Sequence, residues 1–263
     1  MPVSLQQILD ATRQTLPALK ARQDALERDV LGDHLARPSF RAALRRPHLA
    51  VIAEVKRRSP SAGSIREDLD PAERAALYAA HGAAAISILT DTPYFGGSVQ
   101  DLRAAAERCA LPLLRKDFII DEIQILEARA AGASAVLLIV RILTGPRLDQ
   151  LVRCAELLGL DALVEVHTKV ELATALDAGA TLIGVNSRDL DTLSVDVDTA
   201  WRLLAEVPID RIAVAESGLA GRQDVARAAE AGADAVLIGT ALSAAESPAA
   251  LLRELSMVRR HGR

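Results

Sequence analysis

The chain has 263 residues, of which 50% are apolar and 25% charged, and a formal net charge of -4 at pH 7. This composition is ordinary for a globular protein with a well-filled core, and its acidic balance argues against a nucleic-acid partner. An apolar run such as residues 135–140 is too short to cross a bilayer, so we expect no membrane partner either.

The first residues carry Asp10 and Arg13 without a long apolar segment. They do not read as a signal peptide, and we expect a cytoplasmic protein. Cys109 and Cys154 lack the spacing of a disulfide framework or of a metal site, so we predict neither.

Residues 1–46 read as a helical extension. Apolar residues suited to one helix face occur at Leu5, Ile8, Leu9, Leu16, Leu19, Leu26 and Val30. Pro17 and Pro38 are expected to mark breaks between helices, because proline cannot donate the backbone hydrogen bond of a helix interior.

Beyond residue 46, short apolar runs alternate with Ala-rich segments of helical period, which is the pattern of repeated βα units. Strands are predicted at residues 49–55, 83–89, 111–115, 134–140, 161–165, 181–185, 211–215 and 234–238. Glycines that end the preceding helices stand at Gly82, Gly132, Gly179 and Gly232. This repetition favours a closed parallel (β/α)8 TIM barrel over an open doubly wound sheet.

The chain length is close to that of one such barrel, and no flexible Gly/Ser linker follows the extension. We therefore predict a single domain over residues 1–263. In it, residues 1–46 pack on a barrel formed by residues 47–263.

Charged and amide residues stand at or just beyond the ends of five predicted strands: Glu54, Lys56, Lys116, Glu165, Asn186, Arg188 and Glu216. The carboxyl ends of barrel strands meet at one mouth, where ligands bind. Glu54 and Lys56 are two residues apart and so face the same side of their strand. A buried ion pair is a poor device for stability, so this convergence indicates a functional site. We interpret His167, a lone histidine, as a structural or rim residue.

Two glycine turns indicate a phosphate site. Ser217-Gly218 follows the seventh predicted strand, and Gly239-Thr240 follows the eighth and could begin a short helix. Backbone amides in these last two loops are the usual phosphate ligands of this fold. Loop 57–64, rich in Ser, Gly and Arg, could close over a substrate.

Two of the three phenylalanines, Phe95 and Phe118, lie just beyond the second and third predicted strands. They could hold an apolar planar group or simply anchor their loops, and position alone does not separate these alternatives.

Nine short motifs carry a resemblance to a known family. They stand in order along the chain at residues 53–61 (AEVKRRSPS), 89–91 (LTD), 94–98 (YFGGS), 114–119 (LRKDFI), 137–140 (LLIV), 164–167 (VEVH), 183–190 (IGVNSRDL), 215–218 (AESG) and 237–240 (LIGT). Together they resemble indole-3-glycerol phosphate synthase over roughly residues 50–245. Threonine at position 240, where the family often has serine, keeps both the hydroxyl and the backbone amide.

The resemblance implies an enzyme of tryptophan biosynthesis, a carboxy-lyase. Its substrate would be 1-(2-carboxyphenylamino)-1-deoxyribulose 5-phosphate, whose ring it closes with release of carbon dioxide and water. The cyclised iminium can itself accept the electrons of decarboxylation, so no metal or organic cofactor is required. Other tryptophan-pathway enzymes are possible partners.

The resemblance also implies roles for single residues. Lys116 would be the general acid on the substrate ketone, and Glu165 an acid/base group in the dehydration. Lys56 would contact substrate anions and share the proton work, Glu54 would orient it, and Asn186 would hold the reacting portion. We expect a neighbouring cation to lower the pKa of a lysine in this role.

The remaining implied residues bind rather than react. Substrate contacts are expected from Ser59, Phe95, Phe118, Arg188 and Glu216, with the two phenylalanines flanking the anthranilate ring. Phosphate contacts are expected from Ser217, Gly218, Gly239 and Thr240. Two alternatives stay open: an isomerase or epimerase acting on a ribulose phosphate, and a non-catalytic phosphosugar-binding barrel that serves as a partner protein.

Overall fold

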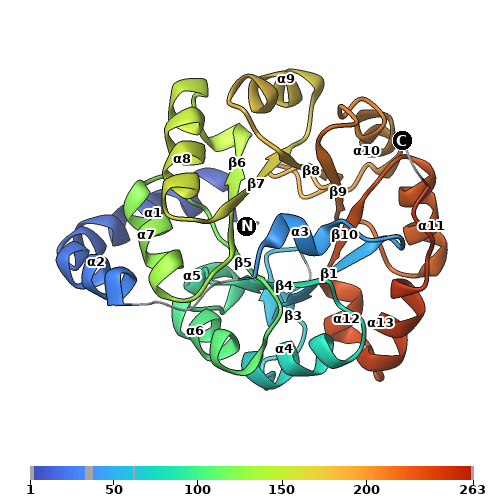
Figure 1. The fold of residues 1–263 in the computed structure, drawn as a ribbon, viewed down its shortest axis with the longest axis horizontal. Coiled ribbons are helices and arrows are strands. Elements are labelled where there is room, and N and C mark those ends of the chain that lie inside the picture. Colours follow the sequence, from blue (N-terminus) through green and yellow to red (C-terminus); the bar gives the residue numbers. More distant parts are fainter. Residues whose placement is uncertain (1–2, 33–37, 62, 262–263) are drawn as a thin grey trace.

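The structure, a computed structural model, describes residues 3–32, 38–61 and 63–261. Eight parallel strands close into a barrel in the order β1-β10-β9-β8-β7-β6-β5-β4 (Figure 1). They are β1 (Ala50–Val55), β4 (Ala85–Leu89), β5 (Leu113–Lys116), β6 (Ala135–Ile139), β7 (Asp161–Val166), β8 (Leu182–Asn186), β9 (Ile212–Glu216) and β10 (Ala235–Ile238). The predicted (β/α)8 barrel and its strands are confirmed.

Helices form the outer ring around these strands (Figure 1). They are α4 (Pro71–Ala80), α6 (Val99–Arg108), α7 (Glu122–Ala130), α8 (Gly145–Leu157), α9 (Lys169–Asp177), α10 (Val197–Leu204), α11 (Arg222–Glu230) and α13 (Pro248–Ser256). Several begin at a side chain that accepts a hydrogen bond from the first turn, as Ser98 does for α6 and Thr168 for α9. Gly82 and Gly132, which follow α4 and α7, have positive φ angles of 106° and 91°, as the prediction for these glycines requires.

Short elements lie at the mouth of the barrel. They are the hairpin β2 (Arg58–Ser59) and β3 (Gly63–Ser64), α5 (Thr92–Phe95), the 3-10 turn η1 (Val140–Ile142) and α12 (Thr240–Ala244). The hairpin lies within the predicted loop 57–64. Arg57 ties the start of this loop to Asp101 of α6 through an ion pair of 2.7 Å.

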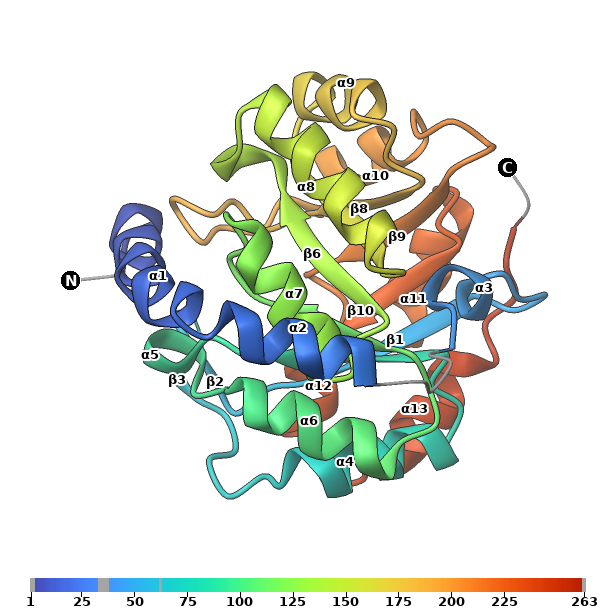
Figure 2. The ribbon, with the colours of Figure 1, turned by 60° about the vertical axis from the view of Figure 1, so that its left-hand side comes forward.

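The amino-terminal extension forms α1 (Leu5–Lys20), α2 (Gln23–Gly32) and α3 (Phe40–Leu44). Both α1 and α2 pack beside α7 (Figure 2), and α3 lies across one end of the barrel with Phe40 and Leu44 fully buried. Pro38 lies outside helix, in the residues before α3, whereas residues 33–37 fall outside the described part of the chain.

The predicted break at Pro17 is wrong, because α1 continues through it to Lys20. Pro17 is exposed, so the carbonyl that loses its helical partner there can be solvated. The helix resumes at once, since the amide of Ala21 donates to the carbonyl of Pro17 at 3.1 Å.

Alternation along the strands divides the core into two layers. In β1, Val51, Ala53 and Val55 pack with the outer helices, while Ile52 joins the cluster inside the barrel. Glu54 has the same parity as Ile52 and therefore points inward. In the part of the chain that the structure describes, no helix is long and apolar enough to cross a membrane.

Candidate active site

A cavity of about 560 Å³ opens at the carboxyl ends of the strands. Every site residue predicted from the sequence lines it: Glu54, Lys56, Ser59, Phe95, Lys116, Phe118, Glu165, Asn186, Arg188, Glu216, Ser217, Gly218, Gly239 and Thr240. The structure thus brings these residues, which lie far apart in the chain, to one cavity. The volume of the cavity is in the range of small-molecule sites.

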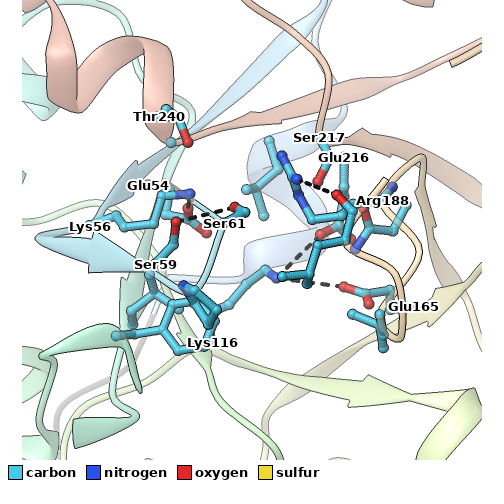
Figure 3. Close-up of a pocket in the computed structure, with 18 of the residues that line it drawn as sticks. Glu54, Lys56, Ser59, Ser61, Lys116, Glu165, Arg188, Glu216, Ser217 and Thr240 are labelled. Carbon is cyan, nitrogen blue, oxygen red and sulfur yellow. Dashed lines mark hydrogen bonds and ion pairs between the residues drawn. The ribbon is translucent and has the colours of Figure 1, made fainter. Parts of the chain in front are cut away.

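Lys116 is the centre of a buried charge cluster at the end of β5 (Figure 3). Its Nζ lies 3.5 Å from Oε2 of Glu165 on β7 and 3.6 Å from Oε2 of Glu216 on β9. The side chains of these two glutamates are 1% and 2% exposed, and that of Lys116 is 16% exposed. Lys116 is therefore the most exposed member of this cluster.

A second pair lies beside this cluster. Nζ of Lys56, just after β1, contacts Oε1 of Glu54 at 2.9 Å (Figure 3). The attraction of Lys56 and Lys116 outweighs burial, which alone would raise the pKa of Glu54, and the net pKa is lowered. Glu54 is thus an anion at neutral pH, held between two lysines.

The expected lowering of a lysine pKa is wrong for Lys116. Burial alone would lower the pKa of Lys116, but the carboxylates of Glu165, Glu216 and Glu54 overcome it and raise the pKa above its ordinary value. The nearest charged side chains to Lys116 are those of Glu165 and Glu216. The second lysine, Lys56, is paired with Glu54. Lys116 is therefore a firmly protonated ammonium.

Glu216 shows the opposite behaviour. Burial, with the charge of Glu165 as the next cause, raises its pKa to about 8, against the opposing attraction of Lys116. Near neutral pH the cluster therefore holds a proton on a carboxyl group in addition to the ammonium of Lys116.

Two glycines make room for these carboxylates. A Cβ at Gly184 in β8 would collide with Oε1 of Glu216, and a Cβ at Gly239 would collide with Oε1 of Glu54. Gly239 was predicted as a phosphate ligand only, and the role of Gly184 was missed. Gly184 did carry a signal in the sequence, because a glycine inside a strand often marks a place where another group closely approaches the backbone.

The predicted phosphate loops lie together at one side of the cavity. Ser217 and Gly218 both have left-handed backbone, with φ angles of 65° and 70°. Gly239 is the N-cap of α12, which begins at Thr240 as predicted. The first amides of a helix have no partner within it, so the start of α12 offers donors at the edge of the cavity, which Ser217 and Gly218 also line.

The opposite side is apolar. The rings of Phe95 and Phe118 face each other with centroids 6.2 Å apart and an angle of 41° between planes. Val3, Leu5 and Ile8 at the amino-terminal end of the chain also line the cavity, a contribution that sequence reasoning missed. These residues look like ordinary packing positions in a helix, so no sequence signal distinguishes them.

Arg188 lies between the two sides. Its amide donates to Oδ1 of Asn186 at 3.0 Å, and its guanidinium donates to the carbonyl of Leu193 at 2.9 Å. Asn186 is 8% exposed at the end of β8. Among the residues that the structure describes, no group of three or more His, Cys, Asp or Glu side chains is arranged to hold a metal ion.

Comparison with known proteins decides the family. A family model described as "Indole-3-glycerol phosphate synthase" matches residues 5–255. The chain belongs to the indole-3-glycerol phosphate synthase family. The resemblance seen in the motifs is confirmed, and the match extends it through the amino-terminal helices.

Relatives named indole-3-glycerol phosphate synthase support this assignment. The protein from Desulfosudis oleivorans is 46% identical over 256 residues, which cover 95% of this chain and 97% of the relative. The one from Parafrankia sp. is 48% identical over 256 residues, covering 96% and 94%. That from Nocardioides sp. is 52% identical over 221 residues, 84% of each chain.

Solved structures support the fold alone. The 3-hexulose-6-phosphate synthase of Salmonella typhimurium superposes with a TM-score of 0.61 at 18% identity, covering 79% of this chain and 97% of that one. The thiamine phosphate pyrophosphorylase of Pyrococcus furiosus gives a TM-score of 0.57 at 17% identity, covering 81% and 95%. The family member described here thus shares its barrel with enzymes of other names.

Proposed function

We propose that this chain catalyses the indole-3-glycerol phosphate synthase reaction. It would close the ring of 1-(2-carboxyphenylamino)-1-deoxyribulose 5-phosphate and release carbon dioxide and water. One observation carries the proposal: a buried ammonium, Lys116, lies against two glutamate side chains in a cavity that also holds an aromatic pair and two glycine turns. The aromatic pair suits the anthranilate ring, and the turns suit the phosphate.

Lys116 is the general acid of ring closure. When the aromatic carbon attacks the ketone, the carbonyl oxygen gains negative charge and becomes far more basic than an amine. A protonated lysine can therefore give its proton to that oxygen even though its pKa is raised. The carboxylate of Glu165 and the carboxyl group of Glu216 also hold the ammonium in place before reaction.

Glu165 is the acid/base group of dehydration. Its carboxylate lies 3.5 Å from Nζ of Lys116, so both groups can reach the same substrate oxygen in turn. The oxygen that Lys116 protonates becomes the hydroxyl that later leaves as water. Glu216, with its raised pKa, supports this region as a substrate contact and shares the buried charge.

Lys56 and Arg188 supply positive charge for the substrate anions. Glu54 orients Lys56 through their 2.9 Å contact, and Asn186 holds the reacting portion beside Arg188. Ser59 contacts the substrate from the loop after β1. These roles are supported by the family resemblance of the motifs and by the position of each residue around the cavity.

We further propose that residues 1–46 and 47–263 work as one domain, because Leu5 and Ile8 of α1 line the same cavity as the catalytic residues. The cytoplasmic location and a partnership with other tryptophan-pathway enzymes stay predictions of the sequence.

The test is an assay of the purified protein without added metal. Incubation with the carboxyphenylamino deoxyribulose phosphate should produce indole fluorescence, and Lys116→Ala should abolish it. Lys169→Ala, which removes an exposed lysine at the start of α9, is the matched control and should keep full activity. Absence of fluorescence from a folded protein that still binds the phosphorylated substrate would instead favour a non-catalytic barrel.

A further inference from the structure

His167 lies directly behind the carboxylate of Glu165. It follows β7, its side chain is 5% exposed, and it is not among the residues that line the cavity. Nδ1 lies 3.1 Å from Oε2 of Glu171, which also accepts the His167 amide at 2.5 Å. Nε2 lies 3.5 Å from Oε1 of Glu165, is buried, and forms no hydrogen bond within the described residues. The imidazole thus stands between two carboxylates.

The outer carboxylate is held firmly. Glu171 lies in the first turn of α9, and its amide donates to the N-cap hydroxyl of Thr168 at 3.2 Å. Its Oε1 accepts from Nε of Arg141 at 3.1 Å, and Arg141 also bonds Asp189 at 3.0 Å. Burial alone would raise the pKa of Glu171, but hydrogen bonds from His167 and Arg141 lower it overall. Glu171 is therefore ionised at neutral pH and can only accept.

This fixes the proton on one nitrogen of the ring. Because Glu171 can only accept, Nδ1 must donate to it. Nε2 then faces Oε1 of Glu165, and a lone pair opposite a carboxylate is repulsive unless a proton lies between them. The charged groups around this pair are Glu171 on one side and, across Glu165, the ammonium of Lys116.

We propose that His167 is a positioning residue for Glu165, an inference that rests on the proposed function. Protonated at Nε2, it holds Oε1 and leaves Oε2 directed at Lys116 and the substrate. In the dehydration, Glu165 takes a proton from the newly closed ring of the substrate and passes it to the departing hydroxyl, which leaves as water. His167 keeps its own proton and stabilises the carboxylate before and after each transfer. The role requires this 3.5 Å contact to shorten to a hydrogen bond in the substrate complex.

Two variants separate this role from a purely structural one. His167→Gln places its terminal amide where Nε2 stands and can still donate to Glu165. His167→Asn places its amide where Nδ1 stands and can donate only to Glu171. If His167 acts through Glu165, the glutamine variant keeps most of kcat and the asparagine variant loses about 10-fold or more, with little change in KM.

The opposite ranking would overturn the proposal, because it would show that the contact with Glu171 and α9 is the one that matters. Equal kcat in both variants and in the parent protein would overturn it as well. Thermal melting of both variants identifies any loss that comes from unfolding. A raised KM with unchanged kcat also counts against the proposal, since it would indicate substrate binding.

A double-variant cycle with Glu165→Gln completes the test. Since the proposed action passes through Glu165, adding His167→Asn to Glu165→Gln should cause almost no further loss. Full additivity of the two losses contradicts the inference. An inactive parent protein would instead refute the proposed function, so the two failures are distinguishable.

Discussion

Two buried charge clusters lie on opposite faces of β5, one residue apart in the chain. Arg115 points outward and donates to Thr90 Oγ1, the carbonyl of Gln124, Glu127 and Asp117 at 2.8–3.1 Å. Lys116 points into the barrel, beside Glu165 and Glu216. Arg115 is 3% exposed as a residue, so burial does not distinguish the clusters.

The difference lies in hydrogen-bond satisfaction. The outer cluster joins each of its charged groups to specific partners, and the amide of Phe118 donates to Asp117 at 2.8 Å. In the inner cluster, none of the four side-chain oxygens of Glu165 and Glu216 has a partner at hydrogen-bond geometry within the described residues, and their contacts with Lys116 are ion pairs of 3.5 and 3.6 Å. Unsatisfied buried acceptors are costly, so they indicate a site arranged for a ligand rather than for stability. The presence of a buried ion pair does not distinguish the two clusters, because both contain one.

The largest effect expected from this comparison is on activity. Lys116→Ala should lower kcat by about 10²- to 10⁴-fold, the usual contribution of a positioned acid. Circular dichroism should show the fold intact, because Lys116 lines the cavity and is not part of the packed apolar core. Unchanged turnover would remove Lys116 from the role of acid.

The neighbouring arginine should behave in the reverse way. Arg115→Met keeps the aliphatic part of the side chain but leaves Asp117 and Glu127 without their buried cation. We expect the free energy of unfolding, measured in urea, to fall by about 3–5 kcal/mol. Lys116→Met is the matched control and should cost less stability. Equal losses in the two variants would mean that both clusters serve the fold.

A smaller effect separates the two steps of the proposed reaction. Glu165→Gln should slow the dehydration by about 10²-fold and ring closure by less, since ring closure depends on Lys116. Carbon dioxide release reports closure and decarboxylation, whereas indole fluorescence reports dehydration, so carbon dioxide should appear first. If both signals keep their normal rates, Glu165 is not the acid/base group.

The sequence predicts the frame of this site well and its electrostatics poorly. Strand alternation correctly places Glu54 and Lys56 on one side, because side-chain period is a local property. The helix-ending role of Gly82 is local as well. Whether a cation or a carboxylate lies beside Lys116 depends on the barrel register, which pairs β5 with β4 and β6 and places Glu165 and Glu216 across the interior. The sequence likewise does not show that the side chain of Glu216 fills the space beside Gly184.

The last expected effect concerns the pH dependence of stability, and it arises from Glu216. Burial and Glu165 raise the pKa of its carboxyl from 4.5 to about 8. Between these values the folded protein binds a proton that the unfolded chain has lost. The free energy of unfolding must therefore decrease as pH rises through this window.

Glu216→Gln isolates this contribution, because glutamine keeps the shape of the side chain and cannot titrate. The free energy of unfolding of the parent protein should fall relative to the variant as pH rises from about 5 to 8, with a slope approaching 1.4 kcal/mol per pH unit, roughly the limit for one proton. Titrating groups remote from Glu216 behave alike in both proteins and cancel in the difference. Parallel stability curves for Glu216→Gln and the parent would mean that Glu216 is ionised in the folded protein. The charges of the inner cluster would then be balanced by their neighbours, as those of the outer cluster are.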